Sequence, residues 1–190
     1  MSTTASRPLT AELVIEVAGR IVDEQGTDAL TMRHLADELG VAVTSIYWHV
    51  GNREELVDAL VDRLLADMGT LRARGATPRD RIASLARALR RKLLDRPHLV
   101  ALAHEQAKTA LMFQPVQVAI ADELVALGLR GPESALALRA LQLHVVTSVL
   151  LVRTIGRYGT DEPVDPLEVF EFTLLAMLDA LAARATRAAT

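Results

Sequence analysis

One short stretch of the sequence gathers polar groups that suit contact with a nucleic acid. It runs from Thr44 to His49 and offers hydroxyl groups on Thr44, Ser45 and Tyr47, followed by the imidazole of His49. Such groups can hydrogen-bond to phosphate oxygens or reach the edges of bases. The stretch is therefore a candidate DNA-contacting surface.

Two guanidinium groups flank this stretch. Arg33 precedes it and Arg53 follows it. A guanidinium can bind the edge of a guanine or meet a phosphate. We expect Arg33 to reach a base and Arg53 to meet the phosphate backbone.

Trp48 stands between Tyr47 and His49 and is the single tryptophan of a chain that is only 3% aromatic. We expect Tyr47 and His49 to be exposed, because an exposed ring beside an imidazole otherwise has little purpose. For Trp48 we expect a structural role, with the indole wedged between the first and fourth helices.

These side chains must be positioned by secondary structure, and the surrounding sequence has only helical periodicity. Apolar residues recur at spacings of three and four, and residues that favour helix starts and stops bound each segment. Asn52 and Glu55 have the spacing of a capping box. Helices are predicted over residues 10–26, 31–40, 43–49 and 52–68.

The segment from Met32 to Val50 is a candidate helix-turn-helix. Two short helices are joined by a turn at Gly40, where glycine can take a positive φ without steric cost. Ala36 is small where the second helix must cross closely. The apolar residues expected to point inward are Leu35, Leu39, Val41 and Ile46. In such a motif the second helix enters the major groove.

The runs ALTMRHLADELGV and SIYWHVGNREELVDAL resemble the DNA-binding head of the tetracycline-repressor (TetR) family, from roughly Leu9 to Met68. The resemblance implies a dimeric repressor with a three-helix head and a helical body. It also implies a double-stranded DNA operator and an unidentified small-molecule inducer that releases the protein from DNA. By match to the family's motif, the DNA contacts would be Thr31, Arg33, Thr44, Tyr47, His49 and Arg53. We add Ser45, because its hydroxyl can also reach a phosphate or a base edge.

Two features of the head depart from this expectation. Ala42 and Val43 stand where the second helix begins and cannot hydrogen-bond to bases, so base discrimination would rest on Arg33 and on DNA shape. Residues 1–70 also hold 5 arginines and 12 acids, a net charge of −7. Most of these acids fall on the first and fourth helices and are expected to face away from DNA.

Beyond residue 70 the sequence predicts a helical body. Helices are expected over residues 78–95, 98–108, 115–127, 132–155 and 166–185. The fold class is therefore all-α with about nine helices. We expect residues 1–50 to form the DNA-binding domain, residues 52–68 to connect, and residues 51–190 to bind a ligand and dimerise.

The last two long helices are apolar on more than one face, which predicts burial on more than one side. A homodimer through these helices is the simplest solution. Candidate ligand-binding side chains are the polar or adaptable groups of the body helices. They are His104, Met112, Phe113, Gln142, His144 and Thr147. Each could instead be a core residue, and His144 could also belong to the interface between subunits.

Other classes of function find little support. The chain has no cysteine, no glycine-rich phosphate loop and no His-Glu-x-x-His or serine-elbow motif, so we expect neither an enzyme nor a metal site nor a cofactor. We expect no membrane span, because the most apolar segment contains Arg139 and His144, and a cytoplasmic location. The alternative is a helical interaction module that kept this fold and lost DNA binding.

Overall fold

The computed structural model describes residues 8–151 and 164–188. Within those ranges the chain forms nine α-helices, two short 3-10 helices and no strand. The predicted all-α class is confirmed. In chain order the elements are α1 (Ala11–Gln25), η1 (Thr27–Ala29), α2 (Met32–Leu39), α3 (Val43–Val50), α4 (Arg53–Met68), α5 (Pro78–Leu94), α6 (Pro97–Glu105), η2 (Thr109–Phe113), α7 (Gln114–Leu127), α8 (Gly131–Leu150) and α9 (Pro166–Ala188).

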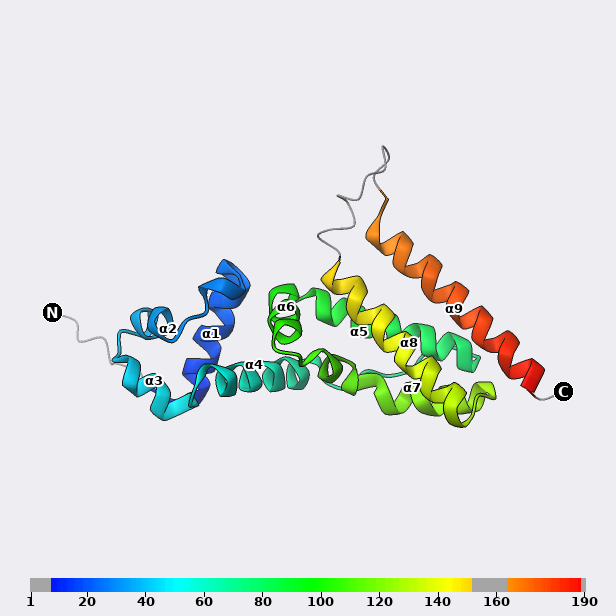
Figure 1. Ribbon diagram of the computed structural model, residues 1–190, viewed down its shortest axis with the longest axis horizontal. Coiled ribbons are helices and arrows are strands. Elements are labelled where there is room, and N and C mark those ends of the chain that lie inside the picture. Colours follow the sequence, from blue (N-terminus) through cyan, green and yellow to red (C-terminus); the bar gives the residue numbers. More distant parts are fainter. Residues whose placement is uncertain (1–7, 152–163, 189–190) are drawn as a thin grey trace.

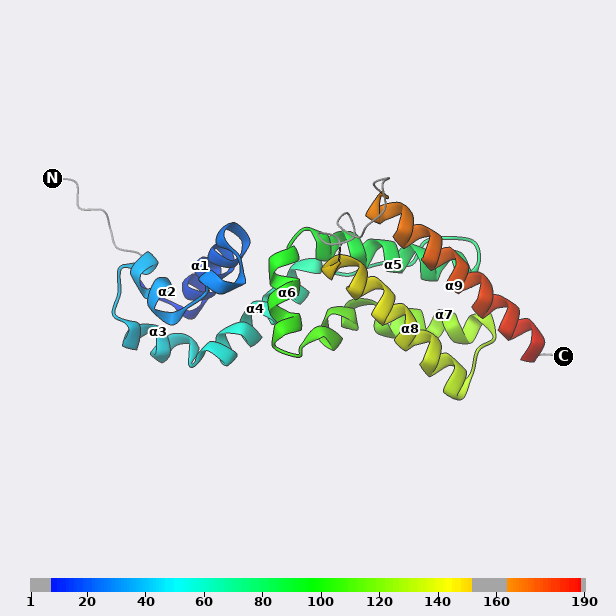
Figure 2. The same ribbon diagram turned by 45° about the horizontal axis from the view of Figure 1, so that its top comes forward.

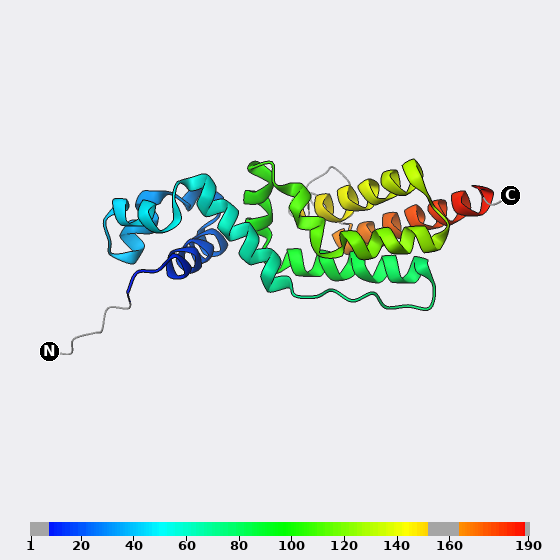
Figure 3. The ribbon, with the colours of Figure 1, turned by 90° about the horizontal axis from the view of Figure 1, so that it is seen from below.

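The molecule is elongated, with a small head and a larger body (Figure 1). Helices α1, α2 and α3 gather at one end, and helices α5 to α9 form the other. Helix α4 runs from the head to the body, and the turned view in Figure 2 keeps this division. Seen from below, the loop after α4 runs along α5 before the chain enters that helix (Figure 3).

The predicted helix starts agree with the observed caps. The hydroxyl oxygens of Thr10, Thr31 and Thr77 each accept a hydrogen bond from a backbone N–H in the first turn of the helix that follows. Asn52 forms the expected capping box with Glu55. Each cap satisfies donors that the helix itself leaves without partners.

Three helices of the body, α6, α8 and α9, end elsewhere than the sequence predicts. Helix α6 ends at Glu105 rather than Lys108, because Ala107 takes a φ of +57° and turns the chain into η2. Helix α8 ends at Leu150, and the predicted extension over residues 152–155 lies outside the described residues. Helix α9 runs on to Ala188.

A continuous apolar core joins the head to the body. In the head, the buried stripe of α1, with Val14 and Ile21, meets Leu35 of α2 and Ile46 of α3. Helix α4 carries the core onward with Leu60 and its neighbours. Full burial of one such aliphatic side chain contributes about 1.5–3 kcal/mol, so the orientation of α3 is set mainly by this packing.

One described stretch, Thr109–Leu127, is long and apolar enough by length and composition to cross a membrane. Its α-helical part, α7, has 14 residues, which at about 1.5 Å per residue is shorter than a hydrocarbon core. It also carries Asp122 and Glu123, and Glu123 pairs with Arg81 of α5 at 2.7 Å. These features are those of a helix that packs one apolar face, with Val116, Ile120 and Leu124, against α5.

Candidate nucleic-acid interface

The turn between α2 and α3 has the backbone that the sequence predicts. Gly40 ends α2 in the left-handed region, with a φ of +67°, and its N–H bonds back to carbonyls of the last turn. Ala36 is buried, as expected for a close helix crossing. Helices α2 and α3 pack on each other and on α1, so the head is a compact three-helix unit that presents α3 at the end of the molecule (Figure 1).

Helix α3 buries a single residue. Ile46 is fully buried, and no other residue of the helix is. Tyr47 is 49% exposed, Thr44 is exposed, and Ser45 and His49 are half-buried. The predicted polar groups of this helix therefore reach the surface.

Trp48 contradicts our expectation. Its side chain is 87% exposed and does not wedge between α1 and α4. Because Ile46 points into the core, a residue two positions later lies about 200° around the helix and must point outward. The indole therefore belongs to the same exposed surface as Tyr47.

The flanking arginines sit at helix starts beside α3. Arg33 is exposed in the first turn of α2. Arg53 begins α4, and its Nε–H donates to the carbonyl oxygen of Leu30 at 3.4 Å, which fixes the guanidinium without using its terminal nitrogens. The hydroxyl of Thr31 already caps α2, where it accepts from the N–H of His34 at 3.1 Å.

Two acidic side chains of the head pair with basic side chains of the body. Asp23 of α1 pairs with Arg96 at 2.7 Å, and Asp58 of α4 pairs with Lys108 at 2.6 Å. These two ion pairs join the head to the body. Glu12 differs: hydrogen bonds from its own backbone and from Thr10 lower its pKa, and a weaker attraction to His49 adds to this. A carboxylate therefore lies near the polar surface of α3, which the sequence did not indicate.

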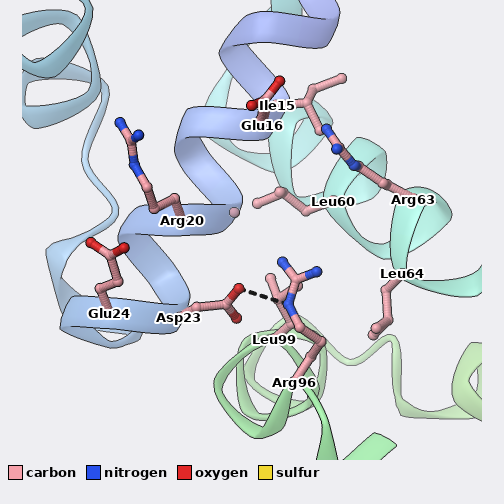
Figure 4. A pocket seen from close by; sticks show the side chains of 11 residues that line it. Ile15, Glu16, Arg20, Asp23, Glu24, Leu60, Arg63, Leu64, Arg96 and Leu99 are labelled. Carbon is pink, nitrogen blue, oxygen red and sulfur yellow. Dashed lines mark ion pairs between the residues drawn. The ribbon is translucent and has the colours of Figure 1, made fainter. Parts of the chain in front are cut away.

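A hollow of about 300 Å³ lies at the junction of head and body, between α1, α4 and α6. Figure 4 shows Asp23 and Arg96 paired across it, with Arg20 and Arg63 on opposite sides. Sequence reasoning did not find this feature, because its residues come from segments far apart in the chain.

The six candidate ligand residues do not form one site. Met112 and Phe113 are fully buried core residues. His104 hydrogen-bonds to Thr109, and the side-chain N–H of Gln142 donates to the carbonyl oxygen of Ala110. Only the two remaining residues, His144 and Thr147, share a cavity.

That cavity has a volume of about 490 Å³ and lies between α8 and α9. The imidazole of His144 stacks on Phe170, with ring centres 4.8 Å apart, and its Nε2 lies 3.1 Å from the Phe170 carbonyl oxygen. Because a carbonyl oxygen only accepts, Nε2 carries the proton. Burial lowers the pKa of His144, so the ring is neutral at pH 7.

The family model described as bacterial regulatory proteins, tetR family, matches residues 14–60. These residues hold the three helices of the head and the first half of α4. The head of this chain, over residues 14–60, is that of the tetR family. The predicted resemblance is confirmed.

Three tetR-family relatives bear on the rest of the chain. An HTH-type transcriptional repressor of Mycobacterium tuberculosis is 34% identical over 149 residues, 75% of this chain and 57% of that protein. The structure of ActR from Streptomyces coelicolor with actinorhodin is 25% identical, covers 94% of this chain and 99% of that one, and has a TM-score of 0.74. BioQ with its natural double-stranded DNA operator is 28% identical, covers 93% and 99%, and has a TM-score of 0.70. The chain spans about half the length of the curated relatives that it matches.

Proposed function

We propose that this protein is a DNA-binding transcriptional regulator, a repressor that leaves a palindromic operator when a small molecule binds its body. The observation that carries the proposal is the surface of α3, where the apolar side of the helix packs on the core and its polar side chains reach the surface. The operator-bound structure of the relative BioQ supports it.

In this proposal the DNA contacts are made from three helix segments. Arg33 and Thr31 act from the start of α2, Arg53 from the start of α4, and the residues between them from α3. The α3 contacts are Thr44, Ser45, Tyr47 and His49. Helix N-termini at α2 and α4 add partial positive charge where phosphates would lie. Residues 1–50 bind DNA, α4 connects, and residues 51–190 bind the ligand and dimerise.

The protomer is proposed to pair through α8 and α9, which lie side by side (Figure 1). Large apolar side chains are exposed on both helices: Leu143 of α8 is 61% exposed and Phe172 of α9 is 76% exposed. A second copy that covers this surface by two-fold symmetry would place two heads for half-sites about 34–36 Å apart. Sedimentation that gives a stable monomer at micromolar concentration would rule this out.

The small-molecule site is proposed to lie in the body, where His144 and Thr147 line the cavity between α8 and α9. The relative ActR was solved with actinorhodin, which supports a ligand-responsive body. Relatives in this family are transcriptional regulators, so we propose a regulator rather than an enzyme. We propose that it acts in the cytoplasm, where DNA is accessible.

The test is a gel-shift titration against the DNA upstream of the protein's own gene. Wild-type protein should retard this DNA, and the double variant Tyr47→Ala, His49→Ala should not, at equal thermal stability. Val118→Ala is the matched control, since Val118 is 72% exposed on α7 in the body. Retention of wild-type affinity by the double variant would refute the assigned surface. No retardation by wild type at low salt would favour the interaction module that lost DNA binding.

A further inference from the structure

A second hollow, of about 410 Å³, lies between α5 and the loop that follows α4. Four arginines line it: Arg72 and Arg74 from the loop, and Arg87 and Arg91 from α5. Arg87 and Arg91 are four residues apart and therefore share a helix face. Figure 3 shows the loop running along α5, and both pairs line the hollow between them. Neither the DNA-contacting surface nor the α8–α9 cavity includes these residues.

The walls of this arginine hollow are held in place by hydrogen bonds. The backbone N–H of Arg74 donates to Ser84 Oγ at 2.8 Å, which ties the loop to α5. Arg87 donates to both carboxylate oxygens of Glu171, with donor–acceptor distances of 2.6–3.0 Å. The guanidinium of Arg87 holds the pKa of Glu171 below its usual range, so this carboxylate stays charged and offsets the charge of Arg87.

Among the residues that the structure describes, the other three arginines have no such partner. Within residues 8–151 and 164–188, no carboxylate pairs with Arg72, Arg74 or Arg91. The segment from Thr70 to Arg91 holds seven arginines and one acid, Asp80, and Asp80 is taken up by the capping box of α5. Uncompensated like charges around one concave surface create a positive potential that attracts anions.

We propose that the arginine hollow binds a small polyanion, a ligand that carries phosphate groups or clustered carboxylates. The guanidinium fork matches both groups in bidentate geometry. Side chains on two facing walls allow a molecule with two or more charged groups to bridge the loop and α5. The hydroxyls of Thr70 and Ser84 lie in the same walls and can add hydrogen bonds.

The arginine hollow lies beside the end of α4, so a bound polyanion would affect how the head is oriented. Helix α4 ends at Met68, and Arg72 follows it by a few residues. A ligand that draws Arg72 toward Arg91 would restrain the body end of α4, whose other end begins at the capping box beside α3. The proposed polyanion is therefore an effector of head orientation, in addition to any ligand of the α8–α9 cavity.

The test is calorimetric titration of the full chain with sodium diphosphate, and separately with citrate, at fixed ionic strength. Whichever of the two anions binds to the wild-type protein should bind to the double variant Arg72→Gln, Arg91→Gln at least about tenfold more weakly. Arg130→Gln removes an exposed charge elsewhere in the body and should bind as wild type does. Diphosphate binding identifies a phosphate ligand, and citrate binding identifies a carboxylate ligand.

Two results would overturn the proposal: no heat of binding with either anion, or an equal loss of affinity in the Arg130→Gln control and the double variant. Circular dichroism of the double variant should match wild type, because it removes only exposed, unpaired charges. The titration contains no DNA, so its outcome is independent of whether the protein binds an operator.

Discussion

Replacement of Ile46 by alanine should unfold the head far more readily than replacement of the much larger Trp48. Ile46 is the one fully buried residue of α3, with Val43 and Val50 partly buried beside it, whereas Trp48 is 87% exposed. Ile46→Ala removes about three buried carbon groups at about 0.8 kcal/mol each, and the residual cavity raises the loss to about 2–5 kcal/mol. Trp48→Ala removes mostly solvated surface and should change the free energy of unfolding by less than about 0.5 kcal/mol.

The comparison is made by urea denaturation followed by far-UV circular dichroism, which reports on both variants equally. For a chain of this size each kcal/mol also lowers Tm by about 2–4 °C. Trp48 supplies an internal reporter in wild type and in Ile46→Ala, because it is the single tryptophan and lies on α3. If Trp48→Ala proves as destabilising as Ile46→Ala, the outward orientation of the indole is wrong.

Gly51→Ala should lower the free energy of unfolding by about 1–3 kcal/mol. Gly51 has a φ of +70°, and an added Cβ would overlap the Glu55 carboxylate of the capping box. An unchanged denaturation midpoint would contradict this. Thr77→Ala should cost about 1 kcal/mol through loss of the α5 cap, to be measured by the same denaturation. Stability should decline as pH falls below about 6.5, because burial lowers the pKa of His144 and the unfolded chain then binds the proton more readily. His144→Gln should flatten this dependence, and an equally steep pH profile in that variant would assign the effect to other groups.

Local rules of sequence were enough to predict most helices of this fold. The caps at Thr31 and Asn52 and the turn at Gly40 depend on residues only a few positions apart. A short stretch of sequence is therefore enough to predict each of them. The same holds for the inward side of α3. The helical angle between Ile46 and Trp48 places the two side chains on opposite sides of α3. The expectation of a buried indole is wrong because it conflicts with this angle.

The features that escaped prediction are made by residues distant in the chain. Asp23 and Arg96 meet because α6 packs on α1, and no local pattern selects that partner among the other arginines. The arginine content after residue 70 was visible, but the hollow depends on how the loop lies along α5. His144 and Thr147 were identified as candidates by type, and only the packing of α9 separates them from Met112, His104 and the others.

The ion pairs from Asp23 to Arg96 and from Asp58 to Lys108 use acidic residues of the head to hold it against the body. Both pairs are partly solvated, so added electrolyte weakens them, and these two links between the head and the body weaken with them. In the proposed dimer, ionic strength would then act twice on operator affinity: once through the counterions that DNA binding displaces, and once through a looser spacing of the two heads. The apparent number of phosphate contacts taken from a salt titration should therefore exceed the number of cations that touch DNA.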